Sequence, residues 1–278
     1  MMKKITVRQD STLLEYLIND LHMSRSNSKK ALTNKIMVND TFTSKFDYPI
    51  KKGDILTIGL TRNSDLDIIY EDDNFIVINK PAGLLSISTD KVKDRTAYHL
   101  VREYLKSIDK HNKIFVLHRL DKDTSGVLVF CKNEKVRNEL QEHWNDIVTK
   151  RGYYAVASNL FDKKQDAIVN YIAYNKFNLG YVTSDTSKQK CITTYKVIKE
   201  NNDLSLLDID IKTGRKNQIR VTLSDIDHPI VGDKNYGGIK ANRLYLHAYE
   251  LAFKYKNKEY VFKTNMPGNF QSILKSRL

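Results

Sequence analysis

The stretch that decides the fold is HRLDKDTSGVLVF, residues 118–130. Its end, Val127 to Phe130, is a short continuous apolar run, which is typical of a buried strand. Residues 114–117 just before it predict another strand. The segment between these two strands is polar, ends in Thr124-Ser125-Gly126 and contains Asp121. A polar loop fixed between two core strands is a rigid place for a reactive side chain.

Composition alone allows two interpretations of this loop. One is an ordinary turn with a local salt bridge, because Asp, Thr, Ser and Gly are common turn residues. The order of the residues favours the other. The segments His118-Arg119-Leu120-Asp121 and Thr124-Ser125-Gly126 together resemble the signature of the RluA-type pseudouridine synthases, which isomerise uridine in RNA. The match is long and ordered, and it implies that Asp121 is the catalytic residue.

The whole chain has 278 residues, of which 41% are hydrophobic, and a net charge of +13. This length suits one large domain plus a small one, and the hydrophobic content excludes a disordered protein. The excess of basic over acidic residues, with a pI near 9.4, favours a polyanionic partner, and nucleic acid is the first candidate. The alternative is charge that only keeps the protein soluble.

The two cysteines, Cys131 and Cys191, have no His or Cys nearby at metal-ligand spacing, so no metal site is expected. So few cysteines in a chain of this size suit a reducing compartment. Residues 1–20 carry scattered charges and do not resemble a signal peptide. No apolar run approaches the roughly 18 residues that span a bilayer. The expectation is a cytoplasmic protein without a membrane partner.

A small α/β domain is predicted over residues 1–62. Leucines at helical spacing between Thr12 and Leu21 predict one helix, and Ser24-Arg25-Ser26 can cap a second. Short strands follow. This pattern resembles the S-four-like RNA-binding domain, named for a small-subunit ribosomal protein. The likeness is carried by Ser24-Arg25-Ser26, Lys29-Lys30, Val38-Asn39 and Lys52-Gly53-Asp54.

The second helix of this domain carries a basic cluster. Arg25, Lys29 and Lys30 would lie near one another, because residues i, i+4 and i+5 are close on a helix surface. Such a cluster is a candidate clamp for RNA phosphates. The alternative is a solvated helix face. The domain shows no strand rich in aromatic residues, so sequence-specific reading of bases by it is not expected.

The second domain is predicted over residues 63–278, and the resemblance runs in order from about residue 67 to 267. It implies an α+β fold, with a mixed, largely antiparallel sheet, flanking helices and an active cleft that crosses the sheet. Further matching segments are Asn79–Leu84 (NKPAGL), Arg151–Ala155, Thr213–Leu223 (TGRKNQIRVTL), His228–Asp233 and Arg243–Ala248.

Two of these segments carry specific expectations. The NKPAGL turn should support the site structurally, since Pro restricts one dihedral angle and Gly permits an unusual one. The segment from Thr213 departs from the family pattern, because Asn217 and Thr222 stand where family members usually carry histidines. It keeps Arg220.

The reaction implied by the resemblance cuts the bond between base and sugar and rejoins the base through carbon 5. Asp121 would be the nucleophile, as carboxylates are in glycosidic chemistry. Burial would raise its pKa, and the family pattern implies Arg220 as the opposite charge that keeps it ionised. Tyr153 would stack on the uracil and remove or relay the carbon-5 proton. Attack at carbon 6 of the ring and attack at the anomeric carbon both stay open.

Four further residues are implied to bind the substrate. Arg119 would fill the space left by a flipped uridine, since a stacked base cannot be reached by the catalytic group. His118 and Thr124 would hold the loop, and Leu246 would form part of an apolar wall. No cofactor is implied, because the isomerisation needs neither a redox change nor an energy input.

The implied partner is RNA, with large-subunit ribosomal RNA as the first candidate and transfer RNA as the second, and the protein is expected to be a monomer. Two other function classes stay open. One is a non-catalytic RNA-binding or ribosome-assembly factor, against which the set of Asp121, Tyr153 and Arg220 argues. The other is a hydrolase that removes bases from nucleic acid, which free uracil or an abasic product would reveal.

Overall fold

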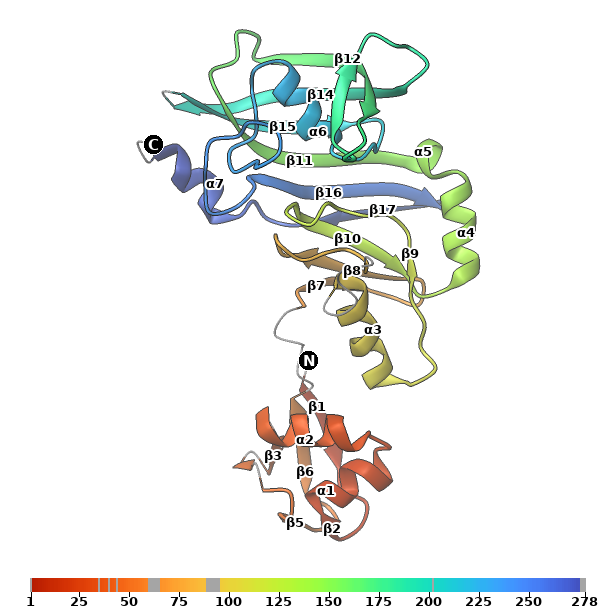
Figure 1. Cartoon of the computed structure of the whole chain (residues 1–278). Helices are drawn as coiled ribbons and strands as arrows, with labels where there is room; N and C mark the ends of the chain where they lie inside the picture. The colour runs from red at the N-terminus through yellow and green to blue at the C-terminus, as the bar shows by residue number, and fades with distance from the viewer. Residues whose placement is uncertain are drawn as a thin grey trace. The chain divides into compact units, whose positions relative to one another are not determined.

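The computed structural model describes residues 2–34, 36–39, 41–43, 45–59, 66–88, 96–201 and 203–275. The chain forms two compact units, one of residues 1–67 with 100–113 and the other of residues 68–99 with 114–278 (Figure 1). The predicted domain boundary between residues 62 and 63 falls in 60–65, outside the described residues.

The smaller unit is built on a sheet of four antiparallel strands in the order β1-β6-β3-β4. The strands and helices are β1 (Met2–Thr6), β2 (Ser11–Thr12), α1 (Leu13–Glu15) followed by a π-helical turn (Tyr16–Asp20), α2 (Arg25–Asn34), β3 (Ile36–Val38), β4 (Thr41–Thr43), β5 (Pro49–Ile50) and β6 (Ile55–Gly59). The predicted leucine helix thus forms, but its second half is a π-turn. Ser24 caps α2, because its Oγ accepts the amide of Asn27 at 3.2 Å, and Leu13, Leu17 and Leu56 pack in the core.

The larger unit is organised around an 11-stranded sheet in which nine strands follow the order β13-β12-β14-β15-β11-β16-β10-β8-β7 (Figure 1). Its strands are β7 (Ile68–Glu71), β8 (Phe75–Lys80), β9 (Phe115–Val116), β10 (Ser125–Cys131), β11 (Val148–Ser158), β12 (Gln165–Tyr174), β13 (Gly180–Thr183), β14 (Gln189–Asn201), β15 (Leu204–Ile211), β16 (Leu246–Tyr255) and β17 (Lys258–Lys263). β10 and β16 pair in parallel, and the other described pairs are antiparallel. The predicted α+β fold with a largely antiparallel sheet is therefore confirmed.

The remaining helices are α3 (Ala97–Ile108), α4 (Glu134–Glu142), α5 (Trp144–Ile147), α6 (Gln218–Asp225) and α7 (Gly268–Ser272), with a 3-10 turn over Ile273–Lys275. Two caps predicted from the sequence are present. Thr96 Oγ1 accepts the amide of His99 at 3.2 Å, and Asn133 Oδ1 accepts the amide of Lys135 at 2.8 Å. A single helix from Asn133 through Trp144 was expected and is wrong. His143 leaves the helical region at φ −115° and ψ 19°, so a new turn begins at Trp144.

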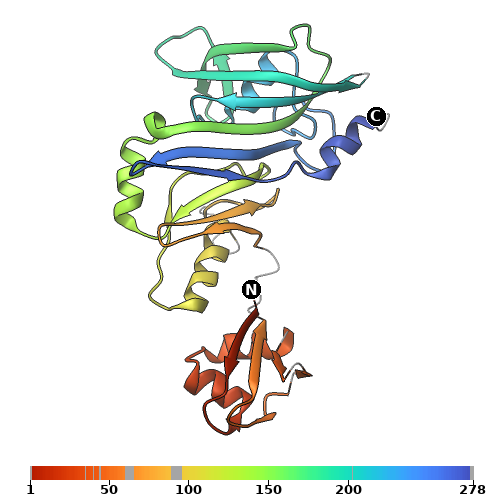
Figure 2. The ribbon, with the colours of Figure 1, turned by 180° about the vertical axis from the view of Figure 1, so that it is seen from behind.

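Two apolar clusters hold the large sheet. One joins β11, β14 and β15 to α6 and the C-terminal turns, and the other joins β8, β10, β16 and β17 to α4. Figures 1 and 2 show α6 on one face of the sheet, seen from the front and then from behind. Every residue of β10 is buried, because this strand lies inside the sheet and is covered on both faces. That burial explains why its sequence is a continuous apolar run instead of an alternation.

The hairpin of β12 and β13 was not anticipated by the sequence analysis, which predicted no strand between residues 159 and 192. It extends the sheet beyond β14, and β13 contacts α6. Exposed apolar residues at several positions, such as Val169 and Tyr181, obscure the alternation that would have revealed it. No described helix of the chain is long and apolar enough to cross a membrane.

Candidate active site

The loop that carries Asp121 leaves β9 and enters β10, and two side chains hold its first half. Ser86 Oγ donates to the carbonyl of Leu120 at 2.7 Å and accepts the Leu120 amide at 3.1 Å. His118 Nε2 accepts the amide of Val129 at 3.1 Å. Burial lowers the pKa of His118 to about 4, and the nearby charge of Arg151 adds to that effect. The imidazole is therefore neutral at physiological pH and works as a fixed acceptor.

The second half of the loop is tied to the NKPAGL turn by a buried lysine. Lys80 is fully buried, and its ammonium donates to the carbonyl oxygens of Pro81, Leu84 and Lys122 at 3.0, 2.7 and 3.0 Å. Burial lowers the pKa of Lys80 to about 7. The three carbonyls use all three donors of the ammonium, so the turn and the loop of Asp121 are joined at one point. This contact agrees with the structural role expected for the turn.

The end of the loop is anchored to β16. Gly126 has φ +119°, and a Cβ added there would lie 2.0 Å from the carbonyl oxygen of Ala248, so only glycine permits the parallel pairing of β10 with β16. Beside it, Ser125 Oγ lies 2.8 Å from His247 Nδ1 and accepts from Arg243 Nη2 at 2.5 Å. The loop that carries Asp121 is thus anchored at both ends.

Asp121 faces Arg220 across the cleft, and its Oδ2 lies 3.6 Å from Arg220 Nη1. Its side chain keeps 31% of its surface exposed, so a substrate can reach it. Burial raises the pKa of the Asp121 carboxyl above its ordinary value. The positive charge of Arg220 is the largest opposing effect, followed by those of Lys80 and Lys216.

Arg220 has a closer carboxylate partner than Asp121. Its Nε and Nη2 donate to Asp233 Oδ2 and Oδ1 at 2.7 and 2.8 Å, and its Nη1 donates to Asn217 Oδ1 at 2.9 Å. The Asp233 side chain is fully buried. This bidentate pair fixes the plane of the guanidinium and leaves Nη1 directed towards Asp121. The family pattern implied Arg220 as the partner of Asp121, whereas the pairing of Arg220 with Asp233 was not predicted from the sequence.

The two positions that replace the family's usual histidines both take part in hydrogen bonds. Asn217 accepts from Arg220, as described above, and its Nδ2 donates to the Tyr236 hydroxyl at 3.1 Å. Thr222 Oγ1 accepts from Asn170 Nδ2 at 3.1 Å inside the core. With these two residues in place, Arg220 keeps its hydrogen bonds to Asp233 and Asn217.

Tyr153 projects from β11 into the cleft. Burial raises its pKa to about 12; the negative charge of Asp121 adds to that rise and the positive charge of Arg151 opposes it. It is therefore a phenol at neutral pH. Tyr154 lies on the opposite face of the sheet, as predicted, and stacks on Tyr249 with ring centroids 4.1 Å apart. The position of the Tyr249 ring in this stack explains why residue 152 is a glycine, because a Cβ there would lie 2.8 Å from that ring.

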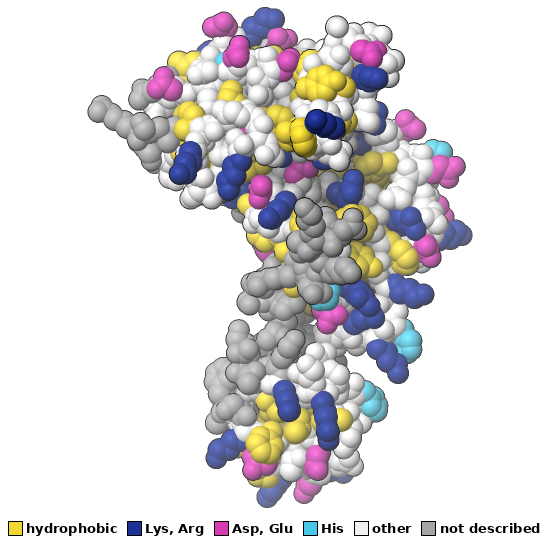
Figure 3. All heavy atoms as spheres, viewed as in Figure 1, with side chains coloured by type: hydrophobic (Ala, Val, Ile, Leu, Met, Phe, Trp, Pro, Cys, Tyr) yellow, Lys and Arg dark blue, Asp and Glu magenta, His cyan; other side chains and the backbone are white. Residues whose placement is uncertain are grey.

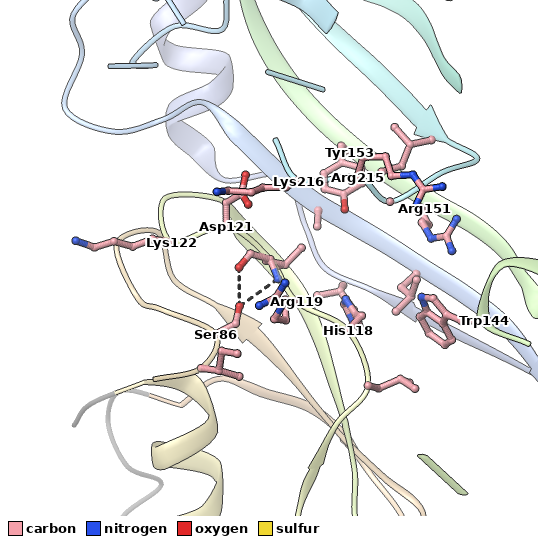
Figure 4. A pocket seen from close by; sticks show the side chains of 18 of the residues that line it. Ser86, His118, Arg119, Asp121, Lys122, Trp144, Arg151, Tyr153, Arg215 and Lys216 are labelled. Carbon is pink, nitrogen blue, oxygen red and sulfur yellow. Dashed lines mark hydrogen bonds between the residues drawn. The ribbon is translucent and has the colours of Figure 1, made fainter. Parts of the chain in front are cut away.

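Asp121 and Tyr153 lie where two cavities meet. The inner cavity has a volume of about 80 Å³ and is lined by Arg119, Leu120, Asp121, Thr124, Tyr153, Ile211, Arg220 and Leu246, among others. The outer cavity, of about 520 Å³, shares Arg119, Asp121 and Tyr153 and extends along His118, Trp144, Arg151 and Lys216. Figure 4 shows Asp121, Arg119 and Tyr153 facing a common space, with His118 and Trp144 farther along it. The names inner and outer distinguish the smaller cavity from the larger one, and Arg119, Asp121 and Tyr153 line both.

The structure brings the predicted catalytic-domain residues together. Asp121, Tyr153, Arg220, Arg119, Thr124 and Leu246 line the inner cavity, and His118 lines the outer one. The predicted phosphate clamp belongs to the other unit. Arg25 and Lys29 are exposed on α2, and the side chain of Lys30 lies outside the described part of the chain.

Arg151 is a functional candidate that sequence reasoning left without a role. It is only 7% exposed, and its guanidinium donates to the carbonyl of Lys212 at 2.9 Å and to Asn145 Oδ1 at 3.2 Å. Burial lowers its pKa, and within the described residues it forms no ion pair with a carboxylate. Its place two residues before Tyr153 was the available signal. No group of three or more metal-ligating side chains occurs in the described ranges.

Comparison with known proteins adds an independent observation. A family profile described as RNA pseudouridylate synthase matches residues 74–225. An uncharacterized RNA pseudouridine synthase of Mycoplasma genitalium is 31% identical over 98% of this chain and 93% of that protein. Ribosomal large subunit pseudouridine synthase D of Borreliella burgdorferi is 32% identical over 88% of this chain and 78% of that protein.

A solved structure shares the fold. Human RNA pseudouridylate synthase domain containing 4 superposes with a TM-score of 0.63 over 75% of this chain and 92% of that one, at 22% identity. The profile match and the relatives that align over most of the chain show that it belongs to the RNA pseudouridylate synthase family, whose members are isomerases.

Proposed function

We propose that this protein converts a uridine of large-subunit ribosomal RNA into pseudouridine, with Asp121 as the nucleophile. The observation that carries the proposal is the place of the Asp121 carboxylate. It lies at the junction of a small inner cavity and a larger outer cleft, 3.6 Å from the guanidinium of Arg220. The choice of ribosomal RNA rests on the name of the Borreliella relative.

The reaction conserves atoms and electrons. The bond from N1 of uracil to the anomeric carbon breaks, a bond from carbon 5 to that carbon forms, carbon 5 loses a proton and N1 gains one. A carboxylate can attack carbon 6 of the ring, and that adduct tethers the uracil while it turns. It can instead attack the anomeric carbon; the ester then tethers the sugar, and the detached uracil is held only by the walls of the site. Tyr153, Ile211 and Leu246 line the inner cavity and can pack against the detached base while it turns.

Asp121 must be ionised to attack. Burial raises its pKa and works against ionisation, while the charge of Arg220 works in favour of it. Because Asp233 holds two nitrogens of Arg220, the third nitrogen stays aimed at Asp121 without needing a substrate to position it. The buried pair of Arg220 and Asp233 is thus a support for the charge of Asp121.

Tyr153 supplies a flat aromatic wall for the uracil and a phenolic proton. Since its pKa is about 12, it cannot act as a standing phenolate base at neutral pH. It can relay, by releasing its own proton to Asp121 or to water as it accepts the one from carbon 5. Leu246 and Ile211 complete an apolar wall around the ring.

Arg119 controls how the uridine enters. It is exposed and lines both cavities, so its guanidinium can occupy the position that the extruded uridine leaves in an RNA helix. The N-terminal unit, which resembles an S-four-like domain, would add phosphate contacts through α2, where Arg25 and Lys29 are exposed.

The experiment that tests the proposal compares RNA from cells that lack this protein with RNA from cells that regain it. Pseudouridines are mapped chemically, and the missing protein is replaced by the wild type or by Asp121→Asn, which keeps the shape of the side chain. We expect one site in large-subunit ribosomal RNA to disappear and to return only with the wild type. A site in transfer RNA would correct the substrate, and return of the site with Asp121→Asn would exclude Asp121 as the nucleophile.

A further inference from the structure

The tip of the β12–β13 hairpin presents an aromatic ring to solvent. Phe177 lies in the turn between the two strands and is 72% exposed. The turn is ordered by its own hydrogen bonds: Asn175 Oδ1 accepts the amides of Phe177 and Leu179 at 2.9 and 3.1 Å, and the Asn175 amide donates to the Leu179 carbonyl at 3.0 Å. Asn178 takes the left-handed conformation at φ 60°. The ring therefore stands on a preorganised loop.

This tip is fastened to the rim of the outer cavity. Lys216, which lines that cavity, donates from Nζ to the carbonyl of Asn178 at 3.2 Å, and the Tyr174 hydroxyl donates to the Lys216 carbonyl at 3.0 Å. From the other side, the amide of Gly180 donates to the hydroxyl of Tyr236 at 3.0 Å. Phe177 is next in sequence to Asn178, whose carbonyl Lys216 binds, so the turn that carries the ring is attached to a residue of the outer cavity.

Cations accompany the aromatic side chains of the hairpin. The ammonium of Lys176 lies 5.2 Å from the centre of the Phe177 ring, and that of Lys216 lies 5.9 Å from the centre of the Tyr174 ring. Figure 3 shows hydrophobic and basic side chains next to one another on the part of the larger unit that carries this hairpin. A single exposed apolar residue is common on protein surfaces. An aromatic ring on an ordered turn, with the Lys176 ammonium near it and the cavity residue Lys216 bound to the same turn, is an arrangement that suits unpaired nucleotides.

We propose that Phe177 is a stacking platform for an unpaired base of the substrate RNA near the flipped uridine, and that Lys176 holds a neighbouring phosphate. The inference rests on the proposed function, because it takes RNA as the molecule in the cleft. Every nucleobase has a π-face, so the platform selects unpaired over paired RNA and does not select a particular base. It explains how a basic cleft distinguishes a loop from a duplex.

The test uses the full chain and two fluorescent RNA probes, a hairpin with an all-uridine loop and a continuous duplex with the same stem. Binding is followed by fluorescence anisotropy over a range of KCl concentrations. We expect Phe177→Ala to weaken binding of the hairpin RNA about tenfold, a typical loss for one stacked base, and to leave the duplex and the salt dependence unchanged. Lys176→Gln should lower the salt slope by about one, and Phe177→Trp should bind as tightly as the wild type.

Val169→Ala is the matched control, because Val169 is 55% exposed on the same hairpin but lies away from its tip. Equal hairpin-RNA affinity of Phe177→Ala and the wild type would overturn the proposal and turn attention to a protein partner for the tip. Equal weakening of both RNAs by Phe177→Ala would also overturn it.

Release of tritium from carbon 5 of labelled uridine in the same samples reports the proposed function separately. Turnover by the wild type combined with unchanged binding by Phe177→Ala would reject the platform and keep the enzyme. Selective weakening of hairpin binding without any turnover would keep the platform and reject the proposed reaction.

Discussion

At the scale of single residues, the basic side chains near Asp121 differ in the groups that accept their hydrogen bonds. Arg220 meets a carboxylate, since Asp233 binds it at 2.7 and 2.8 Å. The Lys80 ammonium donates to three carbonyl oxygens. Its pKa falls to about 7, because hydrogen bonds to these carbonyls do not compensate for the hydration that the buried ammonium has lost. Arg151 likewise meets a carbonyl and an amide oxygen. Lys80 and Arg151 are thus two buried basic side chains that form no ion pair with a carboxylate within the described residues.

Removing the carboxylate of Asp121 should stop the reaction without harming the fold. Asp121→Asn is expected to reduce tritium release to background, because an amide is not a nucleophile. Since burial raises the pKa of Asp121, its charge is less favourable in the folded than in the unfolded state. The variant should be as stable as the wild type or more stable at pH 7, and any gain should vanish as the pH falls through and below about 3.9, where unfolded Asp also becomes protonated.

Urea unfolding at pH 7 and pH 3.5 measures this difference, and tritium release at pH 7 measures activity. A variant that is less stable than the wild type at pH 7 would show that the ion pair with Arg220 outweighs the cost of burial.

Lys80 should give the protein a characteristic pH dependence. Its pKa is about 7 when folded and about 10.4 when unfolded, so unfolding takes up a proton between these values. The contribution of this group to the free energy of unfolding therefore rises with pH from about 7 to about 10.4. In Lys80→Met the rise should disappear, and kcat should fall because the carbonyl of Lys122 loses its donor.

The measurement is the difference in unfolding free energy between wild type and Lys80→Met at pH 7, 8 and 9. Lys122→Met, which changes an exposed side chain on the same loop, serves as the control and should leave the pH dependence intact. A constant difference across this range would contradict the lowered pKa of Lys80.

At the scale of elements, the loop of Asp121 works because β10 connects two parts of one sheet. It pairs antiparallel with β8 and parallel with β16, and β16 in turn pairs with β11, which carries Tyr153. Asp121 stands in the loop that enters β10 and Tyr153 lies on β11, so the two residues are connected through β16.

Disrupting the pairing of β10 with β16 should lower the free energy of unfolding. Gly126→Ala places a Cβ 2.0 Å from the Ala248 carbonyl oxygen at a φ of +119°, so the parallel pairing has to open. We expect a loss of roughly 3 kcal/mol or more in unfolding free energy together with a large loss of activity.

Gly268→Ala is the matched control for urea unfolding, since a Cβ added at Gly268 meets nothing within 4 Å. It should change the unfolding free energy by less than about 0.5 kcal/mol. Equal stability of both variants would mean that β10 and β16 can separate without loss.

At the scale of the whole molecule, each of the two units has its own apolar core, and the positive charge of the chain, +13 in total, suits an RNA ligand throughout. We expect the N-terminal unit to contribute affinity and the larger unit to contribute the chemistry. Arg25→Gln combined with Lys29→Gln should raise KM for RNA and lower the salt slope of binding by about two, with kcat unchanged at saturating RNA.

The same readouts apply to a chain that begins at residue 63. Lys45→Gln, an exposed charge on the smaller unit away from α2, serves as the control for the double variant. If the shortened chain and the full chain react equally fast at limiting RNA, the N-terminal unit does not deliver the substrate.

The sequence by itself determined the features that depend on neighbours along the chain. Residues only a few positions apart were enough to predict three features: the apolar run of β10, the helix caps Thr96 and Asn133, and the loop that holds Asp121. Family resemblance added Tyr153 and Arg220, which the structure places beside the Asp121 loop around one cavity.

Only the tertiary structure determined which polar and charged groups from distant parts of the chain contact one another. Lys80 reaches a carbonyl 42 residues away, and Ser125 meets His247 122 residues away. It also decided that Trp144 lines the outer cavity after the helix break at His143, and that Phe177 stands beside the same cleft. The physical reason is that helix periodicity and capping act between near neighbours, whereas burial and charge balance depend on which distant segments the sheet brings together.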